Sequence, residues 1–277
     1  MNFTNIHPGI KTLLTALVLF AVHCCSPLTV KSPSPALPQE RVASVVSAFT
    51  EQEKAVETLF FTGTLTLKER GSANSVQILM IADATPWAGT GACPYGRMKI
   101  ELTHPWGKAL IHILLEGSRV DILDFTEKRF YSGGLNGKYL SERLRVPLNP
   151  SILWSLARAF PAVLEHRSAA SYAGNRITLL DREGDKVQVF DLYSSEPLPF
   201  KVSFCKENVS MVFSDFQDEG GILYARQVKL DIPEQKISLG IEIDQMRFNT
   251  RLPKAVFEMD PPGDFITVPS KVDPSEH

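Results

Sequence analysis

The sequence predicts a mainly β protein of the α+β class, built on one antiparallel sheet that helices interrupt. Two observations support this prediction. Short segments alternate apolar and polar residues, and clusters of Gly, Asn, Asp or Pro separate them at roughly the 8–12-residue spacing typical of antiparallel sheets and barrels. The two runs of such segments show no linker between them and no internal repeat, so a single domain over residues 40–264 is the simplest organisation.

The first 39 residues carry signals for export and anchoring. Leu13–Val22 is almost entirely apolar, is shorter than the ~20 residues that cross a bilayer, and fits the hydrophobic region of a signal peptide. Two cysteines follow, as in a bacterial lipoprotein signal; the small residue before the cut favours Cys25 as the lipidated residue, with Cys24 as the alternative. We expect a signal peptide over 1–24 and a proline-rich tether over 25–39. A secreted protein with an ordinary cleaved signal, or a buried N-terminal helix, is the alternative.

A helix is predicted to open the domain. Glu40–Thr58 places Val42, Val45 and Phe49 at close to helical spacing, with a polar opposite face. From Leu59 onward the pattern changes to short alternating segments. The strands predicted there are Phe60–Lys68, Ser75–Ala82, Arg97–Thr103, Ala109–Leu115, Arg119–Asp124 and Arg129–Tyr131.

A second helix is predicted between the two runs of strands. Asn149 suits the N-cap, Pro150 suits the first helical position, and Pro161 ends a helix over Ser151–Phe160. A flexible tail is expected over residues 265–277. The strands predicted after this helix are Arg176–Asp181, Lys186–Tyr193, Phe200–Cys205, Val209–Asp215, Tyr224–Leu230 and Lys236–Phe248.

Charge and motifs point away from nucleic-acid binding and from catalysis. The formal net charge is −2 at pH 7, which provides no electrostatic footprint for nucleic acid. Ser132–Tyr139 resembles a phosphate loop, but its glycines are too close together and Tyr139 replaces the required Ser or Thr. Glu116, Asp121 and Asp124 lie near strand ends, where exposed turn carboxylates are common. We therefore predict that the protein is no enzyme and holds no cofactor or metal.

Two predicted loops carry tryptophan. Thr103–Lys108 joins two strands through Pro105 and Gly107, both turn formers, and this places Trp106 at the tip. A longer loop contains Trp87. An indole at such a tip either folds back on the core or touches a partner or a membrane, for which its mixed apolar and polar character is suited.

Several segments resemble the LolB family of outer-membrane lipoproteins, which receive other lipoproteins. Met98–Leu115 is similar to that family's strand, P-x-G loop and strand. Val146–Pro161 is similar to its entry into a helix with a central tryptophan, here Trp154. The N-terminal helix followed by Phe61–Leu65 also fits, as does the late strand pair ending at Phe248.

This resemblance implies an unclosed β-barrel, that is, a strongly curved antiparallel sheet covered by a few helices around an apolar cavity. It implies a lipid-anchored monomer of the outer membrane that faces the periplasm. The expected partners are the acyl chains of lipoproteins, a periplasmic LolA-type carrier and the inner leaflet of the outer membrane. The apolar residue of the P-x-G loop, here Trp106, is implied to touch the membrane. Cys93 and Cys205 either pair in an oxidising compartment or remain separate thiols.

The predicted function is to bind acyl chains of lipoproteins and help to insert them into the outer membrane. The alternative is a binding or scaffold lipoprotein with the same fold that serves another lipid or assembly. Each candidate cavity residue has ordinary core packing as its alternative interpretation. The candidates, on the apolar face of the early strands and on the covering helix, are Leu65, Leu67, Ile78, Met80, Ile100, Leu102 and Trp154.

Overall fold

The structure is a computed structural model that describes residues 35–69, 71–84, 96–134 and 149–269. From Pro35 onward, the described residues form one compact unit. Several predicted features lie outside the described residues: the signal peptide, most of the tether, Cys24, Cys25, Trp87 and Cys93. Cys205 is an exposed free thiol directly after a strand.

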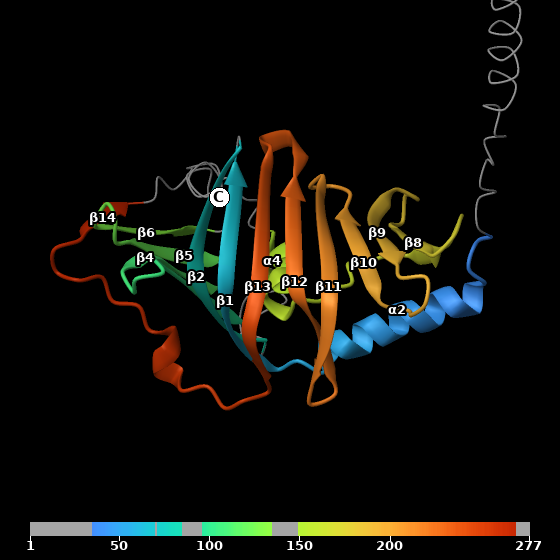
Figure 1. The fold of residues 1–277 in the computed structure, drawn as a ribbon, viewed down its shortest axis with the longest axis horizontal. Helices are drawn as coiled ribbons and strands as arrows, with labels where there is room; N and C mark the ends of the chain where they lie inside the picture. The colour runs from blue at the N-terminus through green and yellow to red at the C-terminus, as the bar shows by residue number, and fades with distance from the viewer. Residues whose placement is uncertain (1–34, 70, 85–95, 135–148, 270–277) are drawn as a thin grey trace, which may run out of the picture. The chain divides into compact units, whose positions relative to one another are not determined.

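The unit is mainly β and contains one curved, unclosed sheet, as predicted (Figure 1). Within the described residues the sheet has 14 strands in the order β14-β6-β5-β4-β3-β2-β1-β13-β12-β11-β10-β9-β8-β7. All neighbours are antiparallel except β14 and β6, which are parallel. The first run comprises β1 (Thr58–Glu69), β2 (Ser72–Asp83), β3 (Arg97–Thr103), β4 (Ala109–Glu116), β5 (Arg119–Asp124) and β6 (Arg129–Gly134).

The second run of strands follows the second helix. It comprises β7 (Ser168–Ala170), β8 (Arg176–Leu180), β9 (Lys186–Leu192), β10 (Pro199–Phe204), β11 (Val209–Glu219), β12 (Ile222–Ile232) and β13 (Ile237–Phe248). Each run is a meander of hairpins. The two runs meet where β1 pairs with β13. The first strand of the first meander and the last strand of the second meander therefore form the centre of the sheet.

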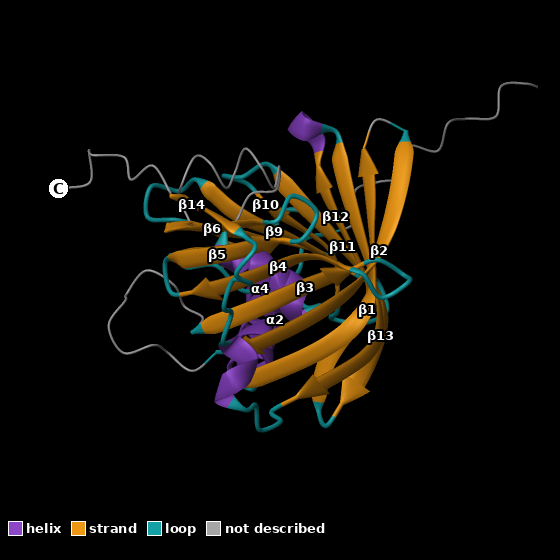
Figure 2. Cartoon of the chain, turned by 90° about the vertical axis from the view of Figure 1, so that its left-hand side faces the viewer, coloured by secondary structure: helices purple, strands orange, loops and turns teal. Residues whose placement is uncertain are grey.

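Two α-helices lie within the curve of the sheet, as Figure 2 shows, and share its apolar core. The first, α2 (Gln39–Lys54), ends four residues before the predicted boundary, and its buried face carries Val42, Val45, Val46 and Phe49. The second, α4 (Pro150–Arg158), begins as predicted, because the Asn149 side chain accepts hydrogen bonds from the backbone N–H groups of Ser151 and Ile152. It ends before the predicted Pro161, because Ala159 adopts a left-handed conformation that closes the helix.

A close approach of backbones at the centre of the sheet requires glycine. The β1–β13 register shifts between Thr62 and Gly63, so β13 bulges there. A Cβ added at Gly63 would overlap the backbone carbonyl oxygen of Glu242. A side chain at this position would therefore force the two runs of strands apart.

The C-terminal segment corrects the predicted boundary. A 3₁₀ helix, η2 (Lys254–Phe257), packs Phe257 against Ile81 and Leu114, which point to the convex face of the sheet. The chain then forms β14 (Ile266–Pro269) beside β6. The folded body thus extends to Pro269, and the tail predicted to begin at residue 265 is wrong for residues 265–269, because backbone pairing with β6 orders them.

Candidate functional site

The concave face of β1–β6 is lined by rows of side chains that the strand register aligns. One row joins Phe61, Met80, Ile100, Ile113 and Ile122 across five strands. All five are buried, and Met80 is only 2% exposed. The row is mostly aliphatic and forms part of a single apolar cluster with α2 and α4.

On the concave face of β1–β6, burial decreases toward one end, which we call the Trp106 end. It carries the turns at residues 69–72, 104–108 and 125–128, and the start of β14. Near this end the apolar residues are only half-buried, although they still pack against the cluster. These half-buried residues are Leu65, Leu67, Leu102 and Ile111, together with Leu239 on the adjacent β13, which pairs with Leu67.

The seven predicted cavity residues all belong to this apolar surface. Ile78, Met80, Ile100 and Trp154 are buried core residues, with Trp154 on α4. Leu65, Leu67 and Leu102 are among the half-buried residues near the Trp106 end. The structure therefore brings the seven into one cluster, and divides them into a buried set and an accessible set. Ile111 and Leu239 belong to the accessible set and were missing from the prediction, although both follow the same alternation.

Trp106 is held away from the core by its turn. The backbone N–H of Gly107 donates to the His104 carbonyl at 2.7 Å, and Gly107 has a φ of 84°, which favours glycine. The Trp106 ring stands 4.7 Å from the His104 ring and is 90% exposed. The interpretation in which this indole folds back on the core is therefore wrong.

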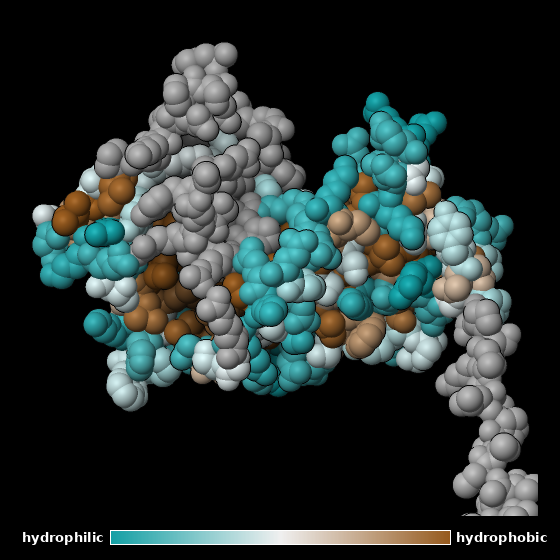
Figure 3. All heavy atoms as spheres, turned by 90° about the horizontal axis from the view of Figure 1, so that it is seen from above, coloured by the Kyte–Doolittle hydropathy of each residue, from teal (hydrophilic) through white to brown (hydrophobic). Residues whose placement is uncertain are grey.

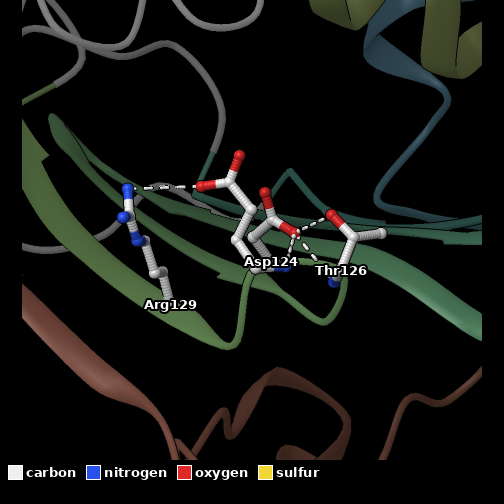
Figure 4. Close-up of polar contacts among 4 residues, drawn as sticks. Asp124, Thr126 and Arg129 are labelled. Carbon is white, nitrogen blue, oxygen red and sulfur yellow. Dashed lines mark hydrogen bonds and ion pairs between the residues drawn. The ribbon is translucent and has the colours of Figure 1, made fainter.

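The next turn along the Trp106 end is closed by a buried carboxylate (Figure 4). Asp124 is 6% exposed and faces the same side as Ile111. Its Oδ1 accepts hydrogen bonds from the backbone N–H groups of Thr126 and Glu127 and from the Thr126 hydroxyl. Arg129 pairs with Glu127 at 3.3 Å. These contacts show Asp124 acting as the local acceptor of the β5–β6 turn.

The other half of the concave face is filled. Phe49 of α2 packs against Phe160 and Phe190 with ring centroids 5.3 and 5.4 Å apart. Phe190 and Phe213, on β9 and β11, have no exposed surface. Aromatic packing by α2 therefore makes the centre of this half part of the core, whereas Phe216 and Tyr224 on β11 and β12 remain half-buried.

Figure 3 shows the face of the molecule that is seen from above in the orientation of Figure 1. Hydrophobic side chains are visible there in recesses among hydrophilic rim residues. A separate groove of about 400 Å³, lined by both charged and apolar residues, lies at the tips of the β1–β2 and β12–β13 hairpins. Its lining includes Lys68, Glu69, Asp231 and Lys236.

Two features are absent from the described residues. No group of three or more His, Cys, Asp or Glu side chains is placed to hold a metal ion in this part of the chain. Among its helices, none combines the length and apolar character that crossing a bilayer requires.

Comparison with known proteins identifies the fold. No protein-family model and no curated protein matches this chain. A DUF1329 family protein from Desulfovibrio piger superposes with a TM-score of 0.52 at 12% identity, covering 78% of this chain and 97% of that one. A putative outer membrane lipoprotein-sorting protein domain from Vibrio parahaemolyticus gives 0.50 at 13% identity, covering 79% and 97%. A LolA superfamily protein from Nitrosomonas europaea gives 0.49 at 14% identity, covering 79% and 97%. The first two similarities show that this chain has the fold of these proteins.

Proposed function

We propose that this protein is an envelope lipoprotein that binds acyl chains on the concave face of β1–β6. The single observation that carries the proposal is the set of half-buried aliphatic residues that lies beside the exposed Trp106. Leu65, Leu67 and Leu102 are only half-buried, so part of their apolar surface is available to contact a ligand. Flexible aliphatic side chains are well matched to a flexible hydrocarbon chain.

The energetics of burial determine how such a protein would work. Each CH₂ removed from water gains ~0.8 kcal/mol, so a bound acyl chain is not released into water at a useful rate. It has to pass directly between apolar sites. We propose that a periplasmic carrier of the LolA type delivers the chain and that the inner leaflet of the outer membrane accepts it, with this protein as a binding step and no catalysis.

Trp106 would orient the binding surface toward the acceptor membrane. Indole favours the headgroup region because it is both apolar and polar, and its burial is worth about 1–3 kcal/mol. That is enough to orient the protein but not to anchor it. Anchoring is assigned to a lipid on Cys25, or on Cys24. The similarity to a lipoprotein-sorting domain supports this class of function.

The first test is lipid extraction from the purified protein followed by mass spectrometry, with displacement of a fluorescent fatty acid in solution. Bound or bindable acyl chains are expected. Their absence would reject the proposal and favour a scaffold role for the same fold.

The second test is lipoprotein transfer to vesicles by the Trp106→Glu variant. Transfer should fall while folding is retained, because Trp106 is exposed and makes little contribution to the core. Tyr172→Glu is the matched control. Tyr172 is another exposed aromatic residue, at 67%, but it lies in the β7–β8 turn at the opposite end of the sheet. Equal transfer by both variants would reject the role of the loop. Palmitate labelling of Cys25→Ala and Cys24→Ala identifies the anchored residue.

A further inference from the structure

The Trp106 end carries a second exposed apolar side chain. Only four large hydrophobic residues of the described chain are exposed, and Ile266 is one of them, at 65%. It opens β14, where it pairs with Arg129 at the start of β6. Both Trp106 and Ile266 therefore lie at the same end of β1–β6.

Their separation follows from the topology. Between the β3–β4 turn that carries Trp106 and β14 lie β5 and β6. With neighbouring strands ~4.8 Å apart, the two side chains stand roughly 15–20 Å from each other along the rim. Two apolar contacts at this spacing define an orientation that a single contact cannot.

The carboxylates on this stretch of rim are paired. Asp264 forms an ion pair with Lys128 at an N···O distance of 2.7 Å, and Glu127 forms one with Arg129 at 3.3 Å. Lys108, next to the Trp106 turn, adds an exposed positive charge. Approach to an anionic lipid surface is therefore not opposed by free carboxylates at these positions.

The start of β14 is held against the sheet by aromatic contacts. Phe265 packs edge-on against Phe125 with ring centroids 5.4 Å apart, and Phe125 packs against His112 at 4.7 Å. The backbone N–H of Ile266 donates to the Lys128 carbonyl at 2.9 Å. Ile266 is thus presented on a fixed strand, so little conformational entropy is lost when it makes a contact.

We propose that Ile266 is a second membrane contact, so that the protein meets a lipid bilayer through Trp106 and Ile266 together. This inference rests on the proposed role of Trp106 at the membrane. It adds that β14 sets the angle at which the accessible aliphatic residues face the bilayer.

The test measures hydrogen exchange on the intact lipoprotein reconstituted in vesicles of phosphatidylethanolamine and phosphatidylglycerol. Ile266→Thr keeps a β-branched residue in β14 but removes the apolar tip, and should weaken docking about threefold to tenfold. Peptides covering 104–108 should then exchange faster in vesicles. Tyr172→Thr is the control and should exchange like the wild type.

A second variant distinguishes loss of the apolar contact from disruption of β14. Ile266→Trp restores an apolar side chain and should slow exchange at 104–108 to the wild-type level or below it. Exchange at 104–108 that is unchanged by Ile266→Thr, or not restored by Ile266→Trp, would overturn the inference. Non-covalently bound acyl chains extracted from the purified protein before it is placed in vesicles report separately on the proposed function, whose failure appears as their absence.

Discussion

The two halves of the concave face are lined by different kinds of side chain, and each kind serves a different purpose. In the helix-packed half, β7–β13 with α2, rings such as Phe49, Phe190 and Phe213 fill the centre and have little or no exposed surface. The aliphatic half, β1–β6, is lined mostly by Ile, Leu and Met, and its inner residues become half-buried toward the Trp106 end. Leu65 and Leu67 illustrate this accessible region.

The difference shows how one sheet can be both stable and able to bind. Rings fixed by edge-to-face contacts fill space and resist rearrangement, so the helix-packed half supplies stability. Aliphatic side chains adapt to a guest at small cost, and their remaining exposed surface is available for burial by that guest.

The largest expected effect is on the helix-packed half. Phe190→Ala should lower the free energy of unfolding by about 3–5 kcal/mol, because it removes a fully buried ring that packs against Phe49. Urea denaturation measures this loss. Below the unfolding transition the variant should still bind a fluorescent fatty acid; a selective loss of binding would contradict the division between the halves.

The next effect is at the junction of the halves. Gly63→Ala should cost about 1–3 kcal/mol, because the added methyl group meets the Glu242 carbonyl. Gly240→Ala is the matched control on the neighbouring strand, where the nearest atom to a new Cβ, the Thr66 carbonyl oxygen, is 4.0 Å away. Thermal unfolding of the two variants should therefore differ, and equal midpoints would refute the close approach.

A smaller effect on stability is expected in the aliphatic half. Leu67→Ser removes a half-buried side chain and should cost about 1 kcal/mol of stability, while weakening fatty-acid binding several-fold. Leu79→Ser is the control, because Leu79 is half-buried on the convex face beneath η2. Fatty-acid titration should separate the two. Equal weakening by both would show that the concave face is not the binding surface.

The smallest effect concerns the pH dependence of stability. Burial lowers the pKa of His112 below its usual value of 6.5, with Glu101 opposing the shift and Lys99 adding to it. Because the folded state disfavours protonation, His112 contributes stability above pH 6.5 that is lost as the pH falls below it. His112→Phe keeps the ring beside Phe125 and removes this loss. Urea midpoints of the two proteins should diverge below pH 6.5; parallel curves would contradict the shift.

The alternation of residues is a reliable guide to most strands and to the face that each side chain takes. Arg97–Thr103 and Arg119–Asp124 have the predicted bounds, and the Asn149 cap forms as expected. β7 and β14 are not predictable in this way, because three- and four-residue segments such as Ser168–Ala170 show no full alternation and form only through their neighbours.

The sequence also does not reveal which residues of the site remain half-buried and which become core. Leu67 and Met80 follow the same period-two pattern, yet one is half-buried and the other is core. The difference depends on where α2 and α4 lie over the sheet, which is a tertiary property. Exposure of Trp106 could be anticipated from Pro105 and Gly107, because they define a tight turn, whereas exposure of Ile266 could not.

The pairing of β1 with β13 has a consequence for the order of folding. Each meander consists of hairpins between neighbours in the sequence, whereas Leu59 meets Phe248 across nearly the whole domain. Contacts between such distant residues carry a large loop-closure cost and slow the search for the native state. We expect the meanders to form first and to zip together along β1 and β13 in the rate-limiting step. Gly63, at the bulge on that junction, then acts on the rate of folding as well as on the final structure.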